Sequence, residues 1–260
     1  MKAKYFPVLV LCVAVIVGAV ACSSGGTAPN GMNAAEIMTM SETAAVNSAR
    51  FSATVGTGMM GETYEMNMVG AIDELNEEMY TIMTSPDIAD YSMQMYIVND
   101  WLYMLDSEYG TSWIKTELTE DMWEEQDPIG PQMELLEDSI EAKYLGMETI
   151  GEFNCYKIEI IPNWDAIFSA TDMEENEGYS TEELTDMIKD TKCMTWIAED
   201  SYYPTQIFFS MTMDMMFLGE MTVDMTMTFF DINQPVTITL PATAKNATEI
   251  SYDDYEEGDW

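Results

Sequence analysis

The chain has 260 residues, with 47 acidic and 9 basic side chains and no histidine, so its formal net charge is −38. A field this negative repels nucleic acids and anionic lipid surfaces, which we therefore exclude as partners. The absence of histidine removes the usual general base and excludes Ser/His/Asp and Cys/His catalysis. We expect a protein that is not an enzyme, with no catalytic residues and no cofactor.

The first 21 residues have the pattern of an export signal. Lys2 and Lys4 precede an apolar run from Phe6 to Val20, and small residues lead to Cys22. This is the order of a secretory signal peptide, and small residues before a cysteine resemble a lipoprotein lipobox, which implies lipidation of Cys22. An uncleaved anchor is the alternative, although the run is shorter than the ~20 residues that span a bilayer. Both place the remaining chain outside the cytoplasm, anchored to a membrane at the cell surface.

The rest of the sequence divides into a tether, one domain and a tail. Residues 22–33 comprise the lipidated cysteine and a small, polar stretch typical of a flexible tether. Residues 34–250 are predicted to form a single α+β domain, beginning with a helix over 34–47 that Asn33 caps. Residues 251–260 are an acidic tail. Further helices are predicted over 119–126, over 131–141 and within 163–190, where Ser180 begins a capping box.

After Arg50 the apolar residues recur with a period of two, which is typical of antiparallel strands with one buried face. Methionine occupies many of the alternating positions. Asn99 and Asp100 lie between two apolar runs and predict a hairpin turn. Gly219 and Glu220 predict a second turn between two long strands. The alternating methionines that we select as candidate ligand contacts are Met66, Met68, Met93, Met95, Met211, Met213, Met215, Met225 and Met227.

Over residues 34–245 the order of elements resembles the LolA-like lipoprotein carriers, including the anchored LppX type. The segments that carry the resemblance are Ala49-Arg50-Phe51-Ser52-Ala53 after the first helix, Tyr96–Met104 with Ser112–Lys115, Tyr144–Gly151 with Cys155–Ile158, Trp196-Ile197-Ala198 with Tyr203-Pro204-Thr205, and Asp231–Val236 with Leu240-Pro241. The resemblance implies a strongly curved antiparallel sheet, an unclosed half-barrel, with helices packed on its concave face. It also implies a cavity that binds a lipid or another apolar molecule for carriage, retention or sensing.

Three interpretations of the 26 methionines stay open. They fill the core of a curved sheet, or they line a cavity for apolar ligands of variable shape, or they bind a soft metal such as Cu(I). Strand alternation alone explains the Met-x-Met spacing, so we predict no metal site. If the cavity is filled by the protein itself, the alternative function is a structural or interaction lipoprotein that works through its acidic exterior.

Two cysteines, Cys155 and Cys193, remain in the folded part after Cys12 and Cys22 are assigned to the signal and the anchor. In an exported domain they are predicted to form a disulfide, with two free thiols as the alternative. Asn246 begins the sequon Asn246-Ala247-Thr248 and is a candidate for glycosylation in a host that glycosylates.

Overall fold

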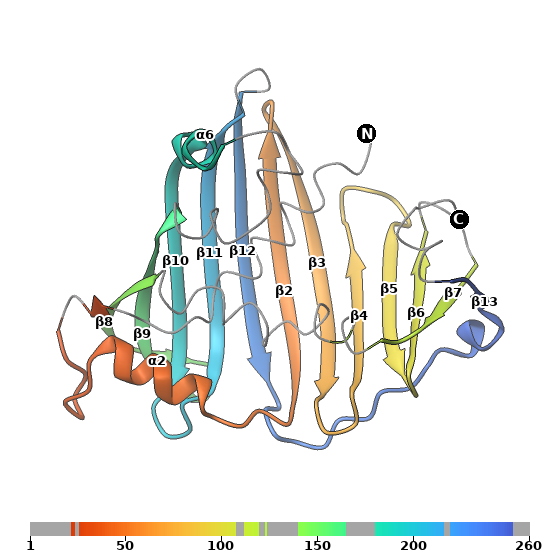
Figure 1. The fold of residues 1–260 in the computed structure, drawn as a ribbon, viewed down its shortest axis with the longest axis horizontal. Helices are drawn as coiled ribbons and strands as arrows, with labels where there is room; N and C mark the ends of the chain where they lie inside the picture. The colour runs from red at the N-terminus through yellow and green to blue at the C-terminus, as the bar shows by residue number, and fades with distance from the viewer. Residues whose placement is uncertain are drawn as a thin grey trace. The chain divides into compact units, whose positions relative to one another are not determined.

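The computed structural model (Figure 1) describes residues 22–23, 26–107, 112–119, 123, 140–164, 180–215 and 219–251. The predicted signal, the acidic tail beyond Ser251, and most of the helices predicted over 119–126 and 131–141 lie outside these residues. The chain divides into two compact units. Unit 1 comprises residues 1–45, 56–63 and 127–227, and unit 2 comprises residues 46–55, 64–126 and 228–260.

Unit 1 contains an antiparallel sheet whose strands follow the order β1-β8-β9-β10-β11-β12. The strands are β1 (Cys22–Ser23), β8 (Ile140–Ile150), β9 (Phe153–Pro162), β10 (Ile188–Ala198), β11 (Pro204–Asp214) and β12 (Glu220–Phe230), of which β12 ends in unit 2. Only β1 runs parallel to its neighbour, since Cys22 and Ser23 pair with Glu141 and Ala142 of β8.

Unit 2 contains strands in the order β2-β3-β4-β5-β6-β7-β13. They are β2 (Ser48–Met59), which begins in unit 2 and ends in unit 1, β3 (Glu62–Asp73), β4 (Glu78–Thr84), β5 (Ser92–Val98), β6 (Trp101–Asp106), β7 (Ile114–Glu117) and β13 (Thr248–Glu249). The short β13 pairs in parallel with β7 at the end of this series. Asn99 and Asp100, with φ of 54° and 63°, form the predicted turn between β5 and β6.

Two α-helices are described, both in unit 1. Helix α2 (Ala34–Glu42) is shorter than predicted and packs against β1 and β8, and α6 (Thr181–Met187) leads directly into β10 (Figure 1). Both predicted caps are confirmed, because Asn33 and Ser180 each form a capping box with the glutamate three residues on. Among the described residues no helix is long and apolar enough to cross a membrane.

The predicted antiparallel sheet is thus confirmed, and α6 is a helical insertion between β9 and β10. The curvature of a half-barrel and helices on its concave face stay predictions. Residues in the second half of the segment predicted as a flexible tether contact unit 1, and the tether itself stays a prediction. Ala28 is buried, and the Asn30 side-chain amide donates a hydrogen bond to the Tyr156 hydroxyl at 2.9 Å. A small, polar composition did not reveal these contacts.

Both faces of the sheet in unit 2 are apolar. One face carries a core cluster of Ala49, Ile72, Met79, Ile97, Leu102 and Met104. The other carries Tyr96, Val98 and Trp113, covered by a C-terminal segment that includes the 3₁₀ helix η2 (Ala242–Asn246). The Trp113 indole donates a hydrogen bond to the Thr243 hydroxyl at 3.1 Å, which fastens this segment to the sheet.

Candidate ligand-binding site

A row of three methionines crosses the sheet in unit 2. Met68 on β3 pairs with Met83 on β4, and Met83 pairs in turn with Met93 on β5. Residues directly opposite in an antiparallel pair share a face, with Cβ atoms about 5 Å apart. All three side chains are partly exposed. The three thioethers therefore form one apolar band that water reaches, and we call Met68, Met83 and Met93 the methionine row.

Burial increases along the same face from this row. The next pairs across the sheet are Thr81 with Met95 and Met95 with Met104. The following row includes Met79 and Ile97, which are 2% and 0% exposed. The face therefore changes over two steps of the strands from a partly open methionine surface to a closed core. Met66, two residues before Met68 on β3, is also partly exposed.

The predicted methionines of unit 1 are placed differently. Met211 and Met213 on β11 are 5% and 7% exposed, and Met225 and Met227 on β12 are 2% and 3% exposed. Their alternation with partly or fully exposed residues is the predicted strand pattern. These four side chains are packed inside the protein. Met215, just after β11, is partly exposed.

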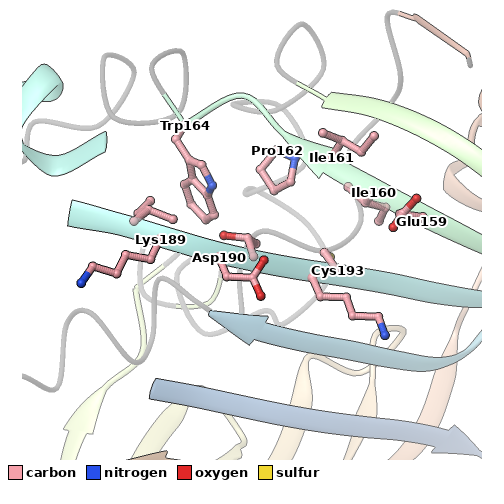
Figure 2. A pocket seen from close by; sticks show the side chains of 11 residues that line it. Glu159, Ile160, Ile161, Pro162, Trp164, Lys189, Asp190 and Cys193 are labelled. Carbon is pink, nitrogen blue, oxygen red and sulfur yellow. The ribbon is translucent and has the colours of Figure 1, made fainter. Parts of the chain in front are cut away.

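Unit 1 also contains a pocket of about 280 Å³ between β9 and β10 (Figure 2). The two strands pair from Ala198 and Cys155 as far as Cys193 and Ile160, and no further. Beyond this point β9 continues to Pro162 and β10 reaches back to Ile188, so each strand presents residues that the other does not pair.

The pocket has a lining of both apolar and polar side chains. Ile160, Pro162 and Ile188 line it, and the Trp164 ring points from the end of β9 toward β10 (Figure 2). Asp190 and Thr191 of β10 also line it, with their side chains on opposite faces of the strand. Thr191 is opposite Met211 in the β10–β11 pairing, so the pocket borders the methionine-bearing face of β11.

The disulfide prediction is wrong, because Cys155 and Cys193 are both free and buried. Cys155 pairs with Ala198, whereas Cys193 pairs with Ile160, five residues further along β9. Successive side chains of a strand alternate between faces, so an odd separation places the two thiols on opposite sides of the sheet. Burial raises the pKa of Cys193 to about 12, and burial likewise raises the pKa of Cys155.

The remaining predicted sites stay predictions. Cys22 lies in β1 beside β8. Asn246 is exposed at the end of η2, where a glycan would not displace packed residues. Within the described ranges no three His, Cys, Asp or Glu side chains are grouped so that they could hold a metal ion.

Sequence reasoning missed Met83 and Met104. Met83 had a weak signal, since Met79, Thr81 and Met83 alternate, but Tyr80 and Ile82 between them are equally apolar. A strand with apolar residues on both faces has no evident buried side until its pairing is known. The register with β3 and β5 supplies that information.

No protein family and no characterised protein matches the chain by sequence. Among solved structures it is similar to the lipoprotein LppX of Mycobacterium tuberculosis, with 14% identity and a TM-score of 0.41 over 78% of this chain and 97% of that one. It is also similar to LprF of Mycobacterium bovis, with 12% identity and a TM-score of 0.45 over 80% and 96% of the two chains. A third is MucB, at 11% identity and a TM-score of 0.39, over 85% and 66%.

Proposed function

We propose that this protein is a membrane-anchored, extracytoplasmic lipoprotein that binds a lipid or another apolar ligand against its methionine-rich sheet. The observation that carries this proposal is the methionine row, three thioethers side by side and partly exposed on one sheet face. A sheet face that only meets water ordinarily carries polar residues. A face of methionine suits ligands of variable shape, because the side chain is flexible and polarizable.

The chemistry proposed is binding without transformation. The ligand would cover the methionine row and extend the core around Met79 and Ile97 that begins on the same face. Each square ångström of apolar surface removed from water contributes about 25 cal/mol. We assign no catalytic step, and hydrolysis of an acyl ester by the purified protein would contradict this part of the proposal.

The proposed anchor is a lipid on Cys22, which follows the apolar N-terminal run. Metabolic labelling with a radioactive or alkynyl fatty acid tests it directly. The wild-type protein should carry the label and sediment with membranes, whereas Cys22→Ser should lose the label. Labelling of Cys22→Ser would place the lipid elsewhere.

One observation favours a second candidate, a surface lipoprotein whose sheet is filled by its own side chains. Met211, Met213, Met225 and Met227 are all nearly inaccessible, as expected for ordinary core residues. In that case the acidic exterior would act on a protein partner. The two candidates differ in whether a ligand accompanies the purified protein.

The deciding experiment measures lipid bound to the full-length protein from a lipid-containing host. After transfer from detergent to an amphipathic polymer, bound lipid is extracted and quantified by mass spectrometry. The proposal predicts an apolar molecule in fixed ratio to protein, beyond the lipid on Cys22. Protein that carries none, and takes up none when lipids are added, would favour the second candidate.

A matched pair of variants tests whether the lipid binds at the methionine row. Met93 and Gln94 are neighbours on β5 with opposite faces, and both are partly exposed. Met93→Glu places a carboxylate in the row, where an apolar ligand would strip its water, so bound lipid should fall by about tenfold or more. Gln94→Glu adds the same charge on the other face and should retain the lipid. Equal loss in both variants would show that added charge, and not the row, is responsible.

A further inference from the structure

The pocket between β9 and β10 contains a hydroxyl that no described group satisfies. The Thr191 Oγ1 atom is shielded from solvent and has no hydrogen-bond partner among the described residues. Thr191 itself lines the pocket. A buried hydroxyl without a partner costs about 1–3 kcal/mol, and most buried polar groups in folded proteins are paired.

The pocket is too small for a whole lipid but suits one end of it. Its volume of about 280 Å³ is at the lower limit of the roughly 300–1,000 Å³ that ligand pockets occupy. Its apolar lining comes from Ile160, Pro162 and Ile188, and the Trp164 ring points toward β10 (Figure 2). An occupant would therefore meet these apolar side chains together with the polar and charged side chains that also line the pocket, Thr191, Asp190, Glu159, Lys189 and Lys192.

The charges around the pocket disfavour an anionic occupant. Two lysines line it, but the Lys189 ammonium is 2.8 Å from the Asp214 carboxylate and the Lys192 ammonium lies over the Phe208 ring. Asp190 and Glu159 add negative charge to the same lining, within a chain of net charge −38. A carboxylate or phosphate in the pocket would be repelled by this negative charge, and both lysines already interact with other side chains.

We propose that this pocket is a subsite for the neutral, hydrogen-bonding end of an amphiphile, with an ester or hydroxyl group bound by Thr191. This inference rests on the proposed function and names the ligand class more closely. Because the Thr191 Oγ1 atom is shielded from solvent, it would meet an occupant after the side chain turns about Cα–Cβ to another of its staggered rotamers. A quaternary ammonium group would suit the carboxylates of Asp190 and Glu159 but offers Thr191 no hydrogen bond.

The test compares four probes of equal chain length in the full-length protein. They are 1-decanoylglycerol, decane, decanoate and decyltrimethylammonium, each titrated below its micellar concentration, with binding followed by native mass spectrometry. The wild-type protein should bind 1-decanoylglycerol most tightly. Thr191→Val should lower the affinity for 1-decanoylglycerol by roughly three- to tenfold, which corresponds to one lost hydrogen bond. The affinity for decane should stay the same or rise.

Two further variants control the result. Thr191→Ser keeps the hydroxyl and should keep the preference, whereas Thr212→Val removes a hydroxyl from the opposite face of β11 and should change nothing. The proposed subsite is wrong if the probes bind but Thr191→Val leaves the order of their affinities unchanged, or if the cationic probe binds best. In either case the proposed function stands. If no probe binds the wild-type protein, both are wrong.

Discussion

Cys155 and Cys193 lie on opposite faces of the sheet in unit 1, one strand apart and five residues out of register. We expect both to remain thiols under oxidising conditions and to react slowly, since burial raises the pKa of each and leaves little thiolate at neutral pH. The measurement is alkylation by iodoacetamide at pH 8, followed by peptide mapping. Both cysteines should be protected in the native protein and labelled in denaturant. A peptide pair joined through Cys155 and Cys193 would contradict the structure.

Phe51 packs directly over Gly70 in unit 2, and this contact leaves no room for a side chain at residue 70. A Cβ atom there would clash with the Phe51 ring and lie 2.6 Å from the Tyr80 carbonyl oxygen. Gly70→Ala should lower the free energy of unfolding by about 1–3 kcal/mol, as expected for overpacking, measured by urea denaturation. Gly56→Ala is the control, because its Cβ would meet only the Asp224 carbonyl oxygen, at 3.9 Å. A similar loss in both variants would assign the effect to glycine replacement in general.

The Glu148 carboxylate stabilises the folded protein, and this contribution depends on pH in the acidic range. It accepts hydrogen bonds from the Lys157 ammonium at 2.8 Å and from the Trp196 indole at 3.0 Å, and these hold its pKa below the ordinary 4.5. A carboxyl whose pKa is lowered by folding stabilises the protein fully above its unfolded-state value. That contribution is lost as the pH falls below about 4.5 and through the lower folded-state pKa.

The corresponding variant is Glu148→Gln. It should be less stable than wild type at pH 7, and the difference should shrink as the pH is lowered toward 3, in thermal unfolding at each pH. Glu159→Gln is the control, since Glu159 is on the same face and its contact with Lys143 is a looser 3.7 Å. A stability difference for Glu148→Gln that does not vary with pH would show that the carboxyl charge is unimportant.

The net charge of −38 predicts stabilisation by salt. Repulsion among like charges opposes the folded state, and the screening length falls from about 30 Å at 0.01 M salt to about 3 Å at 1 M. The urea midpoint should therefore rise with NaCl concentration while the m-value stays constant. A midpoint independent of salt would mean that local ion pairs already offset the repulsion.

The sequence predicted individual helix caps, turns and strands better than it predicted which strands pair and which side chains share a face. Local chemistry sufficed for the Asn33 and Ser180 caps and for the turn at Asn99 and Asp100, because each depends on residues within one turn of chain. The strands with one polar face, such as β12, were also evident from alternation. These features need no knowledge of what lies opposite.

Features that depend on pairing were not predictable in this way. The wrong disulfide assumed that two cysteines in one exported domain meet, whereas the register of β9 and β10 decides which face each occupies. Met83 was missed because β4 is apolar on both sides, each covered by its own cluster. The burial of Ala28 and the hydrogen bond between Asn30 and Tyr156 were not predictable either, because such contacts leave no trace in local composition.

The pairing of β13 with β7 determines how the protein responds to proteolysis near its C-terminal strand. Thr248 and Glu249 occupy the outer hydrogen-bonding positions of β7, and the Lys115 ammonium holds the Glu249 carboxylate at 3.0 Å. An uncovered strand edge is a template on which another chain can add. Proteolytic trimming to Ala247 would therefore not simply shorten the molecule. It would leave the edge of β7 unpaired. Trimmed preparations should therefore form oligomers on storage, while intact ones stay monomeric.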